Sequence, residues 1–461
     1  MGSEFVRSRT SVMGQLSESR LATVRAILTS APDYAVRDLE TTLASGSDRH
    51  DTMRMIHAMV AAEALDRRAR KAVFGPMAPL CSPARKQLGG VTFPSAALAG
   101  TWRGLKIDGG RNVDLAVAGA DSRSFDPPSD EIYDELCAAA AAGLRARSND
   151  GYIAAAAALE TSSGQGVEAF AAYLDIIPVA RSALNHVHDW LGRLNDERIA
   201  SARLTFRDAV AIAEDSGPRL LEILYVHLDE PWAILRLVSA VMQRPDDRFV
   251  ASSELASFGD RLLDDIDAQL KVVAAFDSDR GREAGDTAGA AVRIAAQEIQ
   301  EFDESLDLSP DGPWGSRLTR QRKALVHAVE GRLRSVESEV AAALPVKSAG
   351  FQRKGLRGHP RLTTDPDARQ VQRALAFLSF LKEVRPAAER LGFGALWSKT
   401  AEQVQMRLDT YIEDLLETLR AGEDVNMDRV RIFLDIAADL MGGLSDDRAA
   451  QLVRRRVAAA A

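Results

Sequence analysis

The clearest pattern in the sequence is a helical repeat of apolar residues between Leu396 and Leu419. Its apolar positions are three or four residues apart, with charged residues between them: Trp397, Ala401, Val404, Leu408, Tyr411, Leu415 and Leu419. Steps of three and four return to one side of an α-helix, which has 3.6 residues per turn. The pattern predicts an amphipathic helix over 396–420, ended by Gly422.

A second long helix is predicted from Ser316 to Leu344, where Pro345 stops it. Its apolar stripe consists of Leu318, Leu325, Val329, Leu333, Val336 and Val340. At 1.5 Å per residue this helix would be roughly 43 Å long. A helix of this length needs a neighbour to cover its stripe, so we expect an antiparallel partner.

Shorter stripes with the same spacing predict further helices. The stripes include Leu255, Phe258, Leu262, Ile266, Leu270 and Val273, then Val371, Leu375, Leu378 and Leu381, and then Val430, Phe433, Leu434, Ala437 and Leu440. A helix from about Asp51 to Phe74 is expected to direct Met55, Met59, Ala62 and Leu65 inward. Pro178 interrupts the apolar run 167–191 and should kink or split it.

One region between Gly75 and Ser129 lacks this periodicity and is rich in proline and glycine. Within it, apolar and polar residues alternate on either side of Asp108-Gly109-Gly110. Alternation around such a dipeptide is typical of a β-hairpin. We therefore expect either a short hairpin at 105–117 or an irregular loop there.

The helical patterns together predict an all-α protein, an elongated multi-helix bundle or array of antiparallel helices. Residues 2–5, Gly-Ser-Glu-Phe, have the sequence that two restriction sites would encode, so residues 1–5 are left out of the fold. Breaks in the pattern suggest four parts, with an N-terminal helical region, a central helical array, a basic linker and a C-terminal helical bundle at 6–125, 126–345, 346–366 and 367–461.

The bulk composition is ordinary for a globular protein, with 46% hydrophobic and 27% charged residues among 461. Two cysteines, Cys81 and Cys137, are too few for a disulfide framework and predict buried thiols in a reducing compartment. No run of about 18 apolar residues predicts a transmembrane helix. We expect a soluble cytoplasmic protein, and the abundance of alanine and arginine over lysine suggests a bacterial source.

Charge is unevenly distributed along the chain, whose net charge is −8. Residues 254–311 hold 15 acidic and 5 basic side chains, a balance of −10, so the rest of the chain sums to +2. The segment 346–366 is basic, with Lys347, Arg353, Lys354, Arg357 and Arg361 against the single acid Asp365. These five residues either bind an anionic partner or belong to a solvated linker beside the chain's own acidic surface.

Two clusters contain residues that could bind a metal ion. Asp260, Asp264 and Asp267 share one face of a predicted helix, and His186 and His188 lie two positions apart. Carboxylates and imidazoles are common metal ligands, but an exposed acidic face and surface histidines are the simpler interpretation. No phosphate-binding loop, dinucleotide-binding glycine motif or nucleophile elbow is present in the sequence.

Three functional hypotheses follow. The first is a non-enzymatic scaffold or adaptor that binds other proteins, or copies of itself, through helix faces, without a cofactor. The second is a metal-dependent enzyme with an all-helical active site. The third is a binder of nucleic acid or of an anionic membrane surface through the basic segment 346–366.

Overall fold

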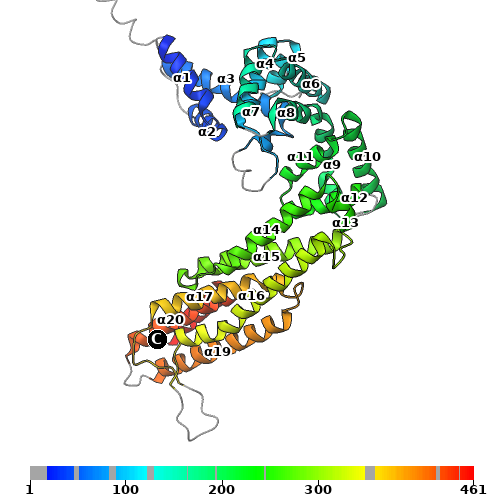
Figure 1. Ribbon diagram of the computed structural model, residues 1–461. Helices are drawn as coiled ribbons and strands as arrows, with labels where there is room; N and C mark the ends of the chain where they lie inside the picture. The colour runs from blue at the N-terminus through cyan, green and yellow to red at the C-terminus, as the bar shows by residue number, and fades with distance from the viewer. Residues whose placement is uncertain are drawn as a thin grey trace, which may run out of the picture. The chain divides into compact units, whose positions relative to one another are not determined.

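The computed structural model describes residues 18–45, 51–82, 90–121, 129–162, 165–192, 195–242, 246–347, 359–421, 426–445 and 447–460. Over these ranges the chain forms α-helices and short 3₁₀ turns and no β-strand, so the predicted all-α fold is confirmed (Figure 1). The chain divides into two compact units, residues 1–231 and 232–461. The finer division expected at 125, 345 and 367 stays a prediction.

Unit 1 begins with three helices whose shared core is small. This core consists of Leu28, Val36, Val60 and Ala64. The helices of unit 1 are α1 (Glu18–Ser30), α2 (Asp33–Ala44), α3 (Asp51–Phe74), α4 (Ser95–Asp108), α5 (Arg111–Gly119), α6 (Asp130–Ala146), α7 (Asp150–Ser162), α8 (Gly166–Asp175), α9 (Ile177–Leu191), α10 (Asp196–Ile212) and α11 (Ser216–His227), with the 3₁₀ turn η1 (Ala78–Cys81). As predicted, the helical run 167–191 is split at Pro178, which occupies the first turn of α9.

The predicted hairpin at 105–117 is wrong, and so is the irregular loop offered in its place. Leu105 lies in α4, and α5 begins at Arg111. Gly109 and Gly110 both have positive φ, and the N–H of Gly109 donates to the carbonyl of Leu105 to end α4. Paired glycines permit this tight break between two helices as readily as a hairpin turn.

Small residues let α4 and α7 cross at short range in unit 1. A Cβ added at Gly100 would overlap Ala155, and one added at Gly151 would overlap the backbone of Gly104. The ring of Tyr152 packs against Gly104 and Gly143 and is fully buried. Sequence periodicity alone does not report this kind of contact, because glycine contributes little to an apolar stripe.

Unit 2 is a helical bundle that includes several long helices. Its helices are α12 (Ile234–Val241), α13 (Asp247–Ala251), α14 (Ala256–Ala274), α15 (Arg282–Ser305), α16 (Pro313–Ala343), α17 (Ala368–Glu383), α18 (Arg385–Ala388), α19 (Gly394–Ala421), α20 (Met427–Leu444) and α21 (Asp447–Ala460), with the 3₁₀ turn η4 (Ser278–Arg280). The 3₁₀ turn η3 (Pro231–Ala233) contains the boundary with unit 1.

Helix α16 runs through unit 2 and packs against α14, α17 and α19. All six residues of its predicted stripe are buried, and it ends just before Pro345, as expected. Helices α15 and α17 approach each other through Gly285 and Gly289, where an added Cβ would overlap Ala376, Ser379 or Glu383. The core of unit 2 is therefore held by apolar stripes and by close backbone contact.

Two further expectations concern the cysteines and membrane-spanning helices. Cys81 and Cys137 are free and buried, and burial raises the pKa of each thiol to about 12. No helix among the described residues is both long enough and apolar enough to cross a membrane.

Candidate functional site

The predicted acidic face of α14 lies against α16. Asp260 Oδ1 accepts a hydrogen bond from Trp314 Nε1 at 2.8 Å. Arg317 pairs with both Asp264 (2.6 Å) and Asp267 (2.5 Å). Partial burial opposes ionisation of Asp267, yet hydrogen bonds from Gln321 and Arg317 hold its pKa below the usual value. The three carboxylates therefore attach the start of α16 to α14.

The histidine pair does not converge on one point. His186 and His188 are both exposed and flank the buried Val187 on α9, and the ring of His186 lies 6.2 Å from that of Trp190. Within the part of the chain that the structure describes, no three His, Cys, Asp or Glu side chains gather as a metal site.

The basic segment is described only at its two ends. Arg353, Lys354 and Arg357 lie outside the described residues. The N–H of Lys347 donates to the carbonyl of His359 at 2.8 Å, and the N–H of Arg361 donates to that of Pro345 at 2.9 Å.

Arg429 of α20 anchors the end of this segment. It pairs with Asp365 at 2.8 Å and donates to the carbonyl of Leu362. The ends of the segment are thus tied down, while anion binding by its five basic residues stays a prediction.

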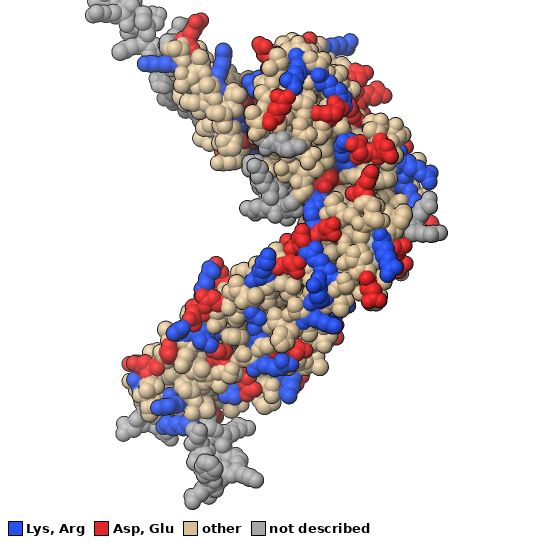
Figure 2. Space-filling view, in the orientation of Figure 1, with Lys and Arg blue, Asp and Glu red and all other residues tan. Residues whose placement is uncertain are grey.

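Part of the acidic charge of residues 254–311 is matched by arginines inside unit 2. Arginines of neighbouring helices pair with it: Arg236 with Glu301, Arg322 with Asp303 and Arg369 with Asp279. On the face shown in Figure 2, acidic and basic side chains of this unit are interspersed. Part of the charge asymmetry of the sequence therefore becomes a set of interhelical ion pairs.

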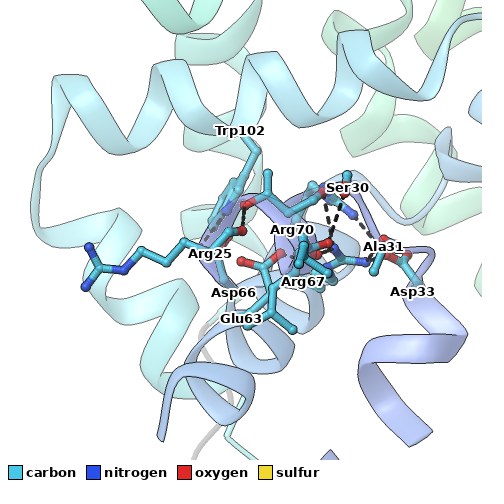
Figure 3. Close-up of polar contacts among 12 residues, drawn as sticks. Arg25, Ser30, Ala31, Asp33, Glu63, Asp66, Arg67, Arg70 and Trp102 are labelled. Atoms are coloured by element: carbon cyan, nitrogen blue, oxygen red, sulfur yellow. Dashed lines mark hydrogen bonds and ion pairs between the residues drawn. The ribbon is translucent and has the colours of Figure 1, made fainter. Parts of the chain in front are cut away.

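A buried arginine in unit 1 was not predicted from the sequence. Arg67 of α3 is buried, and its guanidinium donates to the carbonyls of Leu28 (2.6 Å) and Ala31 (2.8 Å) at the end of α1 (Figure 3). It also pairs with Asp33 at 2.7 Å and Glu63 at 2.8 Å. Each donor has an acceptor from the chain itself, so Arg67 serves as a joint between α1, α2 and α3.

A buried carboxyl group in unit 2 was also missed. Glu298 of α15 is 2% exposed, and its Oε2 has no hydrogen-bond partner among the described residues. Burial, then the hydrogen bond to Asp265 of α14 and the charge of that carboxylate, raise the pKa of Glu298 to about 10. The group is therefore protonated at neutral pH and can donate to Asp265.

An open groove of about 920 Å³ lies beside the N-terminal half of α19 and is called the α19 groove below. Helix α19 lines it with Trp397, Ser398, Ala401, Glu402, Gln405, Met406, Asp409 and Thr410. The other walls are Lys382 of α17, Arg385 of α18, and Leu444 and Ser445 at the end of α20. The sequence analysis placed Trp397 and Ala401 in a core stripe, but the structure leaves both of them partly exposed.

The two ends of the α19 groove differ in charge. At one end the guanidinium of Arg385 lies 5.4 Å from the ring of Trp397, whose Nε1 donates to the carbonyl of Leu381 at 2.7 Å. Neither Lys382 nor Arg385 forms an ion pair with a described residue. At the other end is the carboxylate of Asp409.

An apolar side chain lies between these ends. Met406 is 69% exposed although it lies at a groove. A fixed indole, an exposed thioether and opposite charges at the two ends are features of a surface that binds a protein segment.

The same side of α19 is covered farther along by the chain's own C-terminal helix. Helix α21 packs against α19 and α20, and Arg456 pairs with Glu413, which follows Asp409 by one helical turn. The α19 groove therefore begins where this cover ends.

No protein-family model, curated protein or solved structure matches this chain.

Proposed function

We propose that the protein is a helical scaffold that binds a helix of a protein partner in the α19 groove. The observation that carries this proposal is the uncovered stretch of α19 from Trp397 to Thr410, next to a stretch that α21 covers. Four turns of helix extend about 20 Å, a length typical of helix-in-groove recognition.

The chemistry of the groove supports a protein ligand. Exposed Met406 adapts to many apolar shapes because its side chain is flexible and polarizable. Trp397 is held by its hydrogen bond to Leu381 and by Arg385, so it offers a rigid apolar surface. Rigid aromatic anchors contribute a large share of binding energy at protein interfaces.

A photo-crosslinking experiment tests this proposal. A benzophenone amino acid replaces either Ser398, which lines the groove, or Gln403, which is exposed on the same helix outside it. We expect a discrete protein adduct from position 398, lost when Met406→Glu is added, and none from position 403. Equal adducts from both positions, or an adduct that survives Met406→Glu, would contradict the proposal.

The two other hypotheses stay predictions. A metal site on α14 would have to displace Arg317 from Asp264 and Asp267. An anion site in 346–366 would show binding to DNA, RNA or anionic vesicles that weakens steeply with salt.

A further inference from the structure

We propose that the helix bound in the α19 groove is α19 of a second copy, so that two chains pair antiparallel about a two-fold axis. This inference rests on the proposed function and names its partner. In a two-fold dimer the same surface serves both chains, so that surface must be complementary to itself. The α19 groove meets this condition in the order, the size and the charge of its residues.

The order of the groove residues along α19 is symmetric. They occur as adjacent pairs every four residues, from Trp397 and Ser398 to Asp409 and Thr410. Reversing the helix about a point between Gln403 and Val404 returns the same set of positions. An antiparallel second copy in this register therefore places groove residues opposite groove residues on both sides of the axis.

Side-chain size is complementary in this register. Met406 of one copy lies opposite Ala401 of the other, and the reverse contact occurs on the other side of the axis. A long exposed thioether thus enters the space beside a small residue, as knobs enter holes between packed helices. The contact buries both methionines, which are 69% exposed in the single chain.

Charged groups are complementary as well. Side chains four residues apart form ridges that cross at an angle, so the helices diverge away from the axis. The long side chains of Arg385 and Lys382, at the Trp397 end, reach Asp409 of the second copy across that distance.

The first test is the mass of the full chain in solution, measured by light scattering and sedimentation equilibrium. We expect a dimer that Met406→Glu weakens at least about tenfold, because it replaces the apolar contact with Ala401 of the other copy by a second carboxylate near Glu402. The matched control is Leu452→Glu, since Leu452 is 60% exposed on α21 and does not line the groove. A chain that stays monomeric at its highest attainable concentration would overturn the inference.

A charge exchange tests the predicted contact between copies. Arg385→Asp and Asp409→Arg should each weaken the dimer, since each places like charges opposite one another. The double variant should restore most of the affinity, because the pair is re-formed with its signs reversed. Additive loss in the double variant would contradict the antiparallel register.

Engineered cysteines test the register directly. A variant that carries both Ala401→Cys and Met406→Cys should give a disulfide-linked dimer under mild oxidation. In the proposed register, position 401 of one copy faces position 406 of the other. The native Cys81 and Cys137 are buried and do not compete. Met406→Cys alone should not cross-link, and efficient cross-linking of that single variant would show a parallel or shifted pairing instead.

These results separate the inference from the proposed function. A monomeric chain whose position-398 photo-crosslinker captures a different protein would overturn self-association and leave the scaffold function standing. A monomeric chain with no position-dependent adduct would overturn both.

Discussion

Two regions of this protein join their helices by different means. Helices α1 and α2 each bury a single residue, Leu28 and Val36, in a small apolar core with α3, and polar contacts made by arginines of α3, above all Arg67, add to their attachment. Helices α15 and α17 instead meet through Gly285 and Gly289, with the backbone of one helix close to the other.

The difference separates two kinds of contact, a polar joint that links a few helices and a contact inside a close-packed core. A polar joint gathers several hydrogen bonds on one side chain, so its loss affects only the helices that it links. A glycine contact belongs to a close-packed core, where added volume displaces everything around it. The changes below test this distinction, from the largest expected effect to the smallest.

Gly285→Leu should destabilise unit 2 by about 4 kcal/mol, at the upper end for overpacking. The new Cβ would overlap the carbonyl of Ala376 and crowd the N–H of Phe380, and a helix backbone cannot move aside as a side chain can. Urea unfolding followed by circular dichroism measures the loss.

The matched control for this change is Gly331→Leu on α16. An added Cβ there meets nothing within 4 Å, and leucine favours helix over glycine by up to about 1 kcal/mol. We expect the control to be neutral or stabilising. Equal losses from both variants would show that the effect of leucine does not depend on the contact with α17.

Glu298→Gln should stabilise unit 2 at neutral pH by roughly 3 kcal/mol. The pKa of Glu298 is raised to about 10 in the folded chain, so the folded state holds a proton that the unfolded state has released above its ordinary pKa. Folding stability must therefore fall as pH rises from about 4.5 towards 10. Glutamine keeps a neutral donor towards Asp265 and removes this dependence.

Glu301→Gln, on the same helix, should lower the folding stability of unit 2, the opposite of the effect expected for Glu298→Gln. Glu301 pairs with Arg236 through two contacts of 2.8 and 2.7 Å, so the variant should cost about 1–3 kcal/mol. Urea midpoints measured between pH 5 and 9 distinguish the two changes. A wild-type midpoint that did not fall over this range would refute the assignment of a protonated Glu298.

The apolar stripes of the long helices were predictable because burial follows the helical period. All six stripe residues of α16 are buried, as the sequence indicated. In α19 the stripe is buried from Val404 onward, but Trp397 and Ala401 line the groove. Periodicity shows which side of a helix favours burial, and it does not show whether a neighbouring helix is present to cover that side.

The helical period could not predict which polar residues are buried. The sequence analysis directed Met55 and Ala62 of α3 inward, yet both are exposed, while Arg67 on that helix is buried. Glu298 was counted only as part of an acidic segment. Which charged side chains find partners depends on how helices distant in sequence meet, and no local pattern encodes that.

The same limit applies to the α19 groove. Lys382 and Arg385 come from other helices than Met406, so only the packing of α17 to α20 brings them together. The candidate residues chosen from the sequence were clusters along the chain, and the structure uses Asp260, Asp264 and Asp267 to hold α16. Met406 is an apolar residue outside the predicted stripe of α19, and this was a signal in the sequence. Only the fold shows that Met406 lies at an open groove.

Arg67→Met should have the smallest effect on the whole chain and a clear local one. Methionine keeps much of the length but cannot donate to the carbonyls of Leu28 and Ala31, so α1 and α2 should open more easily, by about 2 kcal/mol. Hydrogen exchange should quicken at amides of α1 and α2 and stay unchanged throughout unit 2. Arg25→Met is the control, since that side chain extends away from the cluster in Figure 3 and should leave exchange unaffected. A loss of protection in unit 2 would mean that Arg67 belongs to one cooperative core with the rest of the chain, and that the contrast between joint and core is wrong.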